Sequence, residues 1–133
     1  MLLKKKTKKK RRRGYKRGLY ISPLGGECKF RSSWEEKYMI YLDSNPLVKS
    51  WSYEKIVIEY ESNKKTKKIR RYYPDFYVEY IDGSKKVIEI KQQRKLENVI
   101  VKKKAAAAVS WCAINGAIYI ILTELELKNM GLI

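Results

Sequence analysis

The chain has 133 residues, 44% of them hydrophobic, which is enough material for one compact core but not for two. Its formal net charge is +17, and it contains two cysteines and no histidine. Ser-His-Asp triads and HExxH proteases need imidazole, and so does a zinc site here, because two isolated cysteines cannot replace it; all three are excluded. Any catalysis must therefore use carboxylates and lysine, with or without a metal ion that prefers oxygen ligands.

The first seventeen residues hold eleven lysines and arginines and no acid, which leaves +6 for the remainder of the chain. Such a block cannot bury enough apolar surface to offset the entropy of ordering it. We therefore expect residues 1–17 to form a disordered basic tail and residues 18–133 to form a single domain. The basic tail favours a polyanion as partner, either nucleic acid or a membrane surface. Nucleic acid is favoured over a membrane surface because the folded domain is basic too. A solubilising or localisation tail is the open alternative.

Neither a secretory signal nor a membrane span is expected. The N-terminus is charged where a signal peptide needs an apolar segment, and no stretch approaches the ~18 consecutive apolar residues of a span. We expect an intracellular protein, not a secreted one, with no membrane partner. In such a protein Cys28 and Cys112 are reduced thiols.

A glycine-rich stretch, residues 14–30, predicts an irregular lead-in, and "RSSWEEKYMIYLDSNP" predicts a helix after it. Ser33 with Glu36 matches a capping box, and Asn45-Pro46 is a stop signal. At ~100° per residue the apolar side chains gather on one side of this helix. They are Trp34, Tyr38, Tyr41 and Leu42, with Met39 at the edge.

Two adjacent acids of this helix point in different directions. Glu36 lies roughly 160° from the centre of the apolar side, whereas Glu35 lies roughly 60° from it. Glu35 therefore points toward whatever the helix packs on, where an unpaired carboxylate is costly. Taken alone, this position is explained better by a salt bridge from Glu35 to a nearby lysine than by a functional site.

Three extended segments are predicted after the helix. They are "VKSWSYEKIVIEYE", "IRRYYPDFYVEYI" and "KKVIEIK", and Asp82-Gly83 is the turn between the last two. The period of two places Glu89 and Lys91 on one face of the third segment. It places Asp75 on one face of the second segment and leaves the other face to Phe76, Val78 and Tyr80.

Pro74 interrupts the second extended segment. Because proline has no N–H to donate to a strand ladder, a bulge, a bend or a sheet edge is favoured at Asp75. If the two strands pair, the Asp75 and Glu89 carboxylates can approach closely enough to share a cation, with Lys91 beside them. Two carboxylates and a lysine beside a hard metal ion suit phosphodiester hydrolysis. The polar face of an ordinary hairpin is the open alternative.

The C-terminal part alternates helix and strand. "RKLENVIVKKKAAAAVSWCAIN" predicts a helix that ends at Asn115-Gly116, and the apolar run after it predicts a strand covered on both faces. A capping box from Thr123 to Glu126 opens a terminal helix. The order helix, three strands, helix, strand, helix predicts an α/β domain around a mixed sheet.

The same residues carry a family resemblance. "PDF" at 74–76 with "EIK" at 89–91 resembles the PD-(D/E)xK nuclease signature, whose core of helix, three strands, helix and strand matches the predicted order. The wider context is "RSSWE", "DSNPLVKSWSYE", "RRYYPDFYVEY", "AVSWC" and "ILTELEL". It is similar to the small head completion nucleases of tailed bacteriophages and, more distantly, to the N-terminal endonuclease domain of TnsA transposon proteins. The resemblance covers roughly residues 18–128 and implies a restriction-endonuclease-like fold.

The resemblance also implies roles for particular residues. Glu35 would be the acid borne by the helix, and Lys91 the catalytic lysine. The metal ligands would be Asp75, Glu89 and the carbonyl of Ile90, with Mg²⁺ or Mn²⁺ as cofactor. The substrate would be DNA at the filled phage head before tail joining, with head, portal or neck proteins as partners and a location in the virion and host cytoplasm. The basic first seventeen residues and the short connection after Lys91 depart from the family pattern.

Several basic residues outside this set are candidates for contact with DNA phosphates, and a solvated surface explains them too. They are Arg70, Arg71, Lys102, Lys103 and Lys104. Two other functions stay open. One is a structural DNA-binding head protein with a vestigial nuclease fold, and the other is a TnsA-like or junction-resolving nuclease that needs a partner protein or branched DNA.

Overall fold

A four-stranded mixed sheet lies at the centre of the computed structural model, which describes residues 17–133. The strand order is β3-β6-β7-β8, and the strands are Val48–Tyr53, Phe76–Tyr80, Lys85–Ile90 and Ile118–Leu122. β3 pairs antiparallel with β6 and β6 with β7, whereas β7 and β8 are parallel. The α/β class and the mixed sheet predicted from the sequence are confirmed. The predicted disordered tail lies, apart from Arg17, outside the described residues.

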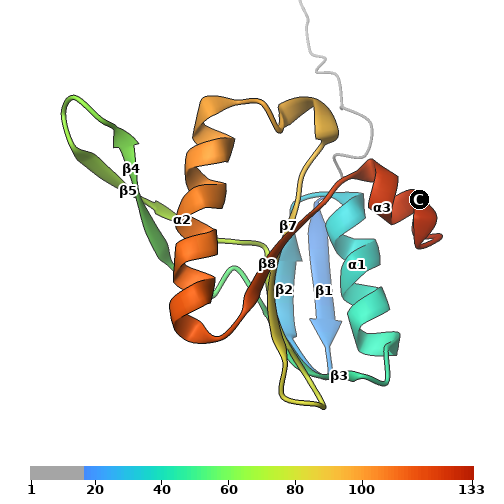
Figure 1. Ribbon diagram of the computed structural model, residues 1–133. Coiled ribbons are helices and arrows are strands. Elements are labelled where there is room, and N and C mark those ends of the chain that lie inside the picture. The colour runs from blue at the N-terminus through green and yellow to red at the C-terminus, as the bar shows by residue number, and fades with distance from the viewer. Residues whose placement is uncertain (1–16) are drawn as a thin grey trace, which may run out of the picture.

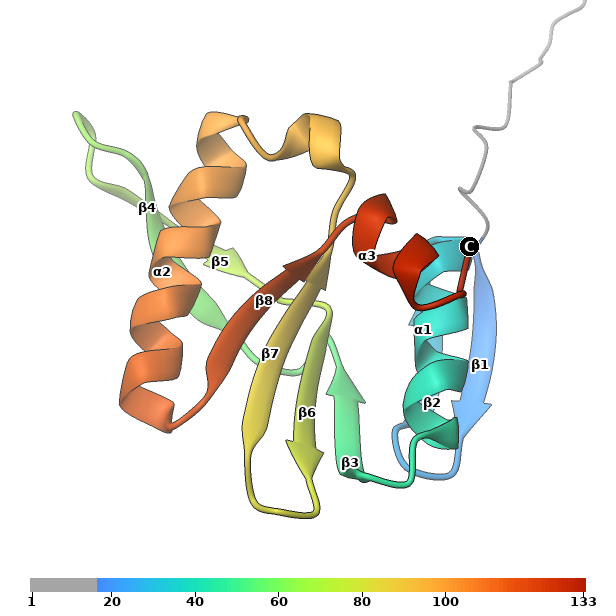
Figure 2. The same cartoon turned by 45° about the vertical axis from the view of Figure 1, so that its right-hand side comes forward.

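Helices cover both faces of this sheet. α1 (Ser33–Ser44) packs on one face and α2 (Val99–Asn115) on the other, and Figures 1 and 2 show the sheet between them. A 3-10 turn, η2 (Gln93–Lys95), connects β7 to α2, and α3 (Glu124–Asn129) follows β8. Along residues 17–133, none of the helices has the length and apolar character that a membrane crossing requires.

Two hairpins flank the central sheet, each as a separate two-stranded sheet. β1 (Gly18–Ser22) and β2 (Gly26–Phe30) pack against α1, so the expectation of an irregular lead-in there is wrong. The long-range partner that orders this hairpin is Asp43 of α1, whose carboxylate accepts from the Tyr20 hydroxyl at 2.6 Å and the Ser22 hydroxyl at 2.7 Å. The second hairpin, β4 (Ile58–Asn63) with β5 (Lys68–Tyr72), packs against α2.

The second hairpin arises because two predicted strands are each split. The first breaks after β3 at Glu54, which has a φ of 53°, and resumes as β4. The second breaks at Tyr73 to Asp75, between β5 and β6, where Pro74 was expected to interrupt the ladder. The three predicted strands are therefore five, although the core order of helix, sheet strands, helix and strand is kept.

The ends of the helices follow the predicted signals with small differences. α1 ends at Asn45 as expected, but its N-cap is Ser32, not Ser33, because the Ser32 hydroxyl accepts from the Glu35 N–H at 3.2 Å. Met39 is completely buried and not at the edge of the apolar side. Gly116 caps α2 with a φ of 69°, and Thr123 and Glu126 form the predicted capping box of α3.

β8 is less covered than expected. It pairs with β7 on one side only, and Ile118 at its start is 61% exposed. Burial increases along the strand toward Leu122, which is close to the pocket end of the sheet. The apolar run therefore belongs to a half-covered edge strand.

Phe76 is the centre of the main core. It is fully buried, and its ring lies 5.2 Å from the ring of Tyr38, 5.8 Å from that of Trp51 and 5.6 Å from that of Tyr53, measured between centroids. Val78 is also fully buried on this face, as the alternation predicted. The core thus holds the start of β6 in place directly beside Asp75.

Replacing Phe76 with alanine should lower the free energy of unfolding by about 3–5 kcal/mol, because it leaves a cavity among three aromatic rings. Ile81→Ala, at a position 63% exposed, should change it by less than about 0.5 kcal/mol. Urea unfolding followed by tryptophan fluorescence measures both. Equal effects of the two substitutions would contradict the placement of Phe76 at the centre of the core.

Candidate active site

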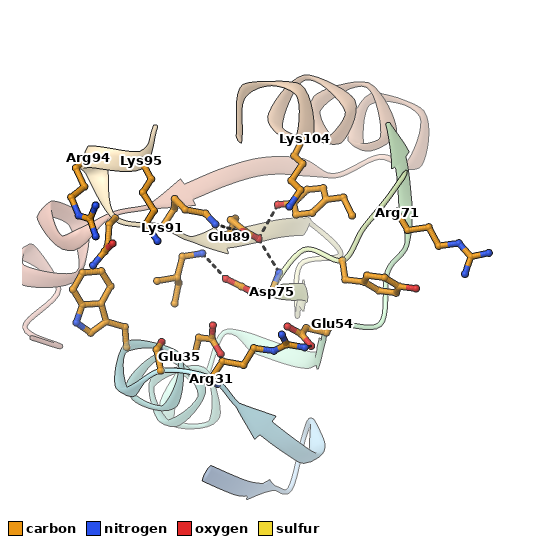
Figure 3. Close-up of a pocket in the computed structure, with 16 residues that line it drawn as sticks. Arg31, Glu35, Glu54, Arg71, Asp75, Glu89, Lys91, Arg94, Lys95 and Lys104 are labelled. Atoms are coloured by element: carbon orange, nitrogen blue, oxygen red, sulfur yellow. Dashed lines mark hydrogen bonds and ion pairs between the residues drawn. The ribbon is translucent and has the colours of Figure 1, made fainter. Parts of the chain in front are cut away.

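The four predicted catalytic residues come from three elements that meet in one pocket of about 470 Å³. Glu35 lies in the first turn of α1, Asp75 precedes β6, and Glu89 and Lys91 lie at the end of β7. Figure 3 shows these side chains around the same space. The structure therefore brings together residues that are up to 56 positions apart in the chain.

The β6–β7 ladder ends in an exchange of side-chain and backbone hydrogen bonds. Phe76 is paired with Ile88, so the same register would place Pro74 opposite Ile90. Instead, the Ile90 N–H donates to Asp75 Oδ2 at 2.8 Å, and the Asp75 N–H donates to Glu89 Oε1 at 3.2 Å. Each carboxylate thus accepts from a backbone N–H of the neighbouring strand, and the Ile90 N–H finds its acceptor in a side chain where the regular ladder stops.

Glu89 is held by further contacts. Its Oε1 accepts from the Tyr72 hydroxyl at 2.8 Å, and that hydroxyl lies 2.8 Å from the hydroxyl of Tyr119. Its Oε2 lies 3.4 Å from Lys91 Nζ. Burial raises the pKa of Tyr72, and the charge of Glu89 raises it further, so this hydroxyl remains a donor.

Glu35 points into the pocket, as its helical position predicted, and is only 8% exposed. Its Oε1 accepts from the Tyr53 hydroxyl at 2.6 Å and from the Arg31 N–H at 2.8 Å. The salt bridge to a lysine that was the alternative is not among the ion pairs of the described chain. Glu35 therefore adds negative charge to the pocket.

Negative charge is concentrated around Asp75 at the bottom of the pocket. Burial raises the pKa of Asp75 well above its ordinary value, and the charges of Glu89 and Glu35 raise it further. Burial also raises the pKa of Glu89, although the neighbouring Lys91 acts in the opposite direction. A bound cation would relieve this repulsion, because it favours the ionised form of each carboxylate.

The rim of the same pocket is basic. Its cationic side chains come from β5, η2, α2 and the segment before α1. They are Arg31, Arg71, Arg94, Lys95 and Lys104. Carboxylates at the bottom and cations at the rim form an arrangement that can hold a metal ion below a polyanion.

The predicted phosphate-binding residues have different surroundings. Arg70 and Arg71 are exposed on β5, and Arg71 lines the pocket. Lys102 pairs with Glu97 at 2.8 Å, and Lys103 donates to the Ser62 carbonyl at 2.9 Å. Lys104 lines the pocket and lies over the Tyr60 and Tyr72 rings, 5.9 and 5.5 Å from their centroids. Lys103 thus fixes the β4–β5 hairpin to α2.

Sequence reasoning missed several residues of the site. The Tyr53 hydroxyl donates to Glu35, and the Tyr119 hydroxyl contacts the Tyr72 hydroxyl. Two cations of the rim, Arg94 and Lys95, were missed as well. Tyr53 and Tyr119 depend on strand registers that one sequence does not reveal. Arg94 and Lys95 lie three and four residues after Lys91, and that position could have identified them.

The oxygen donors fit a hard divalent cation. Asp75 and Glu89 offer carboxylate oxygens, and Ile90, whose N–H donates to Asp75, lies beside them at the end of β7. Among the residues that the structure describes, no three His, Cys, Asp or Glu side chains converge well enough to hold a metal ion by themselves. A cation here would therefore need further oxygen ligands besides the two carboxylates, and Mg²⁺ usually combines one or two carboxylates with several waters.

A family model described as the TnsA-like endonuclease N-terminal domain matches residues 45–124, more than half of the chain. The chain belongs to the TnsA-like endonuclease N-terminal family. The matched range contains Asp75, Glu89 and Lys91, whereas Glu35 lies just before it. The restriction-endonuclease-like fold implied by the sequence resemblance agrees with this membership.

One relative supports the resemblance to the head completion nucleases of bacteriophages. The chain is 37% identical over 80 residues to the head completion nuclease of Enterobacteria phage T4, an alignment that covers 58% of this chain and 53% of the relative. The match therefore spans about half the length of that relative. The family and this similarity together bear out the recognition made from the sequence motifs.

Asp75→Asn should raise the free energy of unfolding near pH 8 in buffer with EDTA, because it removes a buried negative charge and keeps an acceptor for the Ile90 N–H. A carboxylate whose pKa is higher in the folded state destabilises the fold progressively as the pH rises from 3.8 through the folded pKa. The advantage of the variant should therefore shrink as the solution is acidified. Urea unfolding at several pH values measures this.

Asp82→Asn is the matched control, because Asp82 is exposed and its contacts with Ser84 lower its pKa. This variant should not be more stable than the unmodified protein at pH 8. If Asp75→Asn is instead the less stable of the two at pH 8, the crowding of negative charge around Asp75 is contradicted.

Proposed function

We propose that this protein is a metal-dependent DNA endonuclease that hydrolyses phosphodiester bonds. The observation that carries the proposal is the convergence of Glu35, Asp75, Glu89 and Lys91 in one pocket with a basic rim. Membership of an endonuclease family supports the reaction class. The basic rim supports DNA as the substrate, because phosphate contacts by Lys and Arg dominate affinity for DNA.

Asp75, Glu89 and the Ile90 carbonyl would hold the cation, Mg²⁺ or Mn²⁺. When bound, it would neutralise phosphate charge and lower the pKa of a water ligand. The chain itself prepares the ligands, because the Ile90 N–H, the Asp75 N–H and the Tyr72 hydroxyl fix the two carboxylates before any ligand arrives. Preorganised donors of this kind require no rearrangement during the reaction.

Lys91 would act on the scissile phosphate. Its ammonium group is kept beside Glu89, and it lines the pocket on the side of η2. From there it would stabilise the charge that develops on a phosphate oxygen or orient the attacking water. Arg71 on one side and Arg94 with Lys95 on the other would bind the neighbouring phosphates of the strand.

The biological setting is the finer part of the proposal. The similarity to the T4 head completion nuclease supports action on packaged DNA at the filled head before the tail joins. The partners would then be head, portal or neck proteins, and the protein would be found in the host cytoplasm and the virion. A structural DNA-binding head protein with no relevant turnover is the second candidate, favoured by the net charge of +17.

The test is nicking of supercoiled plasmid DNA by the purified protein with Mg²⁺ or Mn²⁺. Asp75→Asn and Lys91→Ala should each lower the rate by about 100-fold or more, because single electrostatic groups of an active site contribute that much. Binding of DNA should survive both substitutions. Equal residual nicking by all three proteins would contradict the nuclease proposal and favour the structural one, and cleavage of branched DNA alone would favour a junction-resolving nuclease.

A further inference from the structure

The outer part of the β4–β5 hairpin extends away from the rest of the molecule. Figures 1 and 2 both show the hairpin continuing beyond α2, on the side away from α1. Its base is buried, through Ile58, Tyr60 and Tyr72, which pack with Ala108 of α2. From Glu61 to Arg71 every residue is exposed except Ser62, which is half-buried. The hairpin is therefore an anchored base with a solvated outer end.

The base of the hairpin is held firmly against the domain. Lys103 of α2 donates to the Ser62 carbonyl at 2.9 Å, and Lys104 lies over the rings of Tyr60 and Tyr72. A two-stranded hairpin alone is only marginally stable in water, so these contacts are what keep the outer end in position. The outer end thus has a defined direction relative to the pocket.

The outer end is strongly basic. Residues 61–71 contain one acid, Glu61, and six cationic side chains. These are Lys64, Lys65, Lys67, Lys68, Arg70 and Arg71. None of the six takes part in an ion pair within the described range 17–133. Their mutual repulsion disfavours the folded hairpin, and a polyanion would remove it.

The hairpin leads directly into the active site. β5 runs from Lys68 to Tyr72, and Asp75 follows three residues later. At ~3.3 Å per residue, Lys68 can lie at most about 23 Å from Asp75. With ~3.4 Å between successive phosphates along a duplex axis, that reach corresponds to about seven base pairs. Arg71 lies between the tip and the carboxylates, on the rim of the pocket.

We propose that the β4–β5 hairpin is an arm that binds the phosphate backbone of duplex DNA on one side of the cleavage site. The inference rests on the proposed nuclease function for the position of the cut, but the binding itself does not require turnover. The DNA strand passes from Arg94 and Lys95, across the carboxylates, to Arg71 and then along the hairpin. Figure 3 shows Arg94 and Lys95 on one side of Asp75 and Glu89, and Arg71 on the other.

Duplex DNA fits the arm better than a single strand does. Proteins that bind single strands stack bases on aromatic side chains, and residues 61–71 contain no aromatic residue. A two-stranded β-ribbon matches the width of the major groove, ~12 Å, where tip lysines reach phosphates on both walls. The arm therefore measures a length of intact duplex beside the cut and contributes no base recognition.

The test replaces the four tip lysines in the full chain by Lys64→Gln, Lys65→Gln, Lys67→Asn and Lys68→Gln. Asparagine is used at residue 67 because its φ of 58° is left-handed, which asparagine tolerates. Fluorescence anisotropy with a labelled 30-mer duplex in EDTA, at a series of KCl concentrations, gives the dissociation constant. The slope of log K against log[KCl] should become shallower by about 2–4, because each lost phosphate contact contributes ~0.9.

The matched control removes four lysines that line neither pocket, by Lys37→Gln, Lys49→Gln, Lys85→Gln and Lys128→Gln. It carries the same net charge as the arm variant, so a non-specific charge effect would appear in both. The control should change the slope by less than about 1. An arm variant that binds duplex like the control, or that loses a single-stranded 30-mer equally, overturns the proposal.

The two proposals fail in different ways. If the unmodified protein does not nick plasmid DNA but the arm variant loses duplex affinity relative to the control, the nuclease function fails and the arm remains. If the unmodified protein nicks plasmid DNA but the two lysine variants bind alike, the arm fails and the nuclease remains. Unchanged urea midpoints of both variants show that any loss of affinity is not a loss of folding.

Discussion

The exchange of hydrogen bonds at the end of the β6–β7 ladder is the constraint on which the rest of the site depends. Pro74 cannot continue the ladder, so the Ile90 N–H turns to the Asp75 carboxylate and the Asp75 N–H turns to Glu89. Two acids are thereby fixed side by side at the end of a sheet that the Phe76 core holds rigid. A regular strand pair would have bonded such N–H groups to backbone carbonyls, and the two carboxylates would have lacked these donors. The interruption is therefore what converts a strand end into a site.

Charge explains what such a site can bind. Asp75, Glu89 and Glu35 face one pocket, and Lys91 is the cation that lies closest to Glu89. Burial raises the pKa of both central carboxyl groups, and the charges of Glu89 and Glu35 raise the pKa of Asp75 further. Outside this acidic centre the side chains are mostly positively charged, both at the rim of the pocket and along the β4–β5 hairpin. A phosphate backbone held by the rim would lie over a cation held by the acids, and this order of charges is the physical basis of the nuclease proposal.

Local patterns predicted the parts of the structure that depend on local physics. The alternation along β6 and β7, the turn at Asp82-Gly83, the cap at Gly116 and the inward direction of Glu35 are examples. Features that depend on distant partners were not predictable in this way. The β1–β2 hairpin needs Asp43, the β4–β5 hairpin needs α2, and the contact between Tyr72 and Tyr119 needs the parallel register of β7 and β8. The candidate set could be predicted from the sequence because Asp75, Glu89 and Lys91 mark strand ends and Glu35 begins a helix, whereas the residues that position them lie on other elements.

The central claim is that Asp75 and Glu89 form a binding site for a divalent cation. The most direct measurement is an anomalous difference map from crystals grown with Mn²⁺, collected for the unmodified protein and for Asp75→Asn. We predict one peak between the Asp75 and Glu89 carboxylates, beside the Ile90 carbonyl, and no peak there in the variant. A well-ordered Mn²⁺ bound elsewhere, with this position empty in the unmodified protein, would contradict the account.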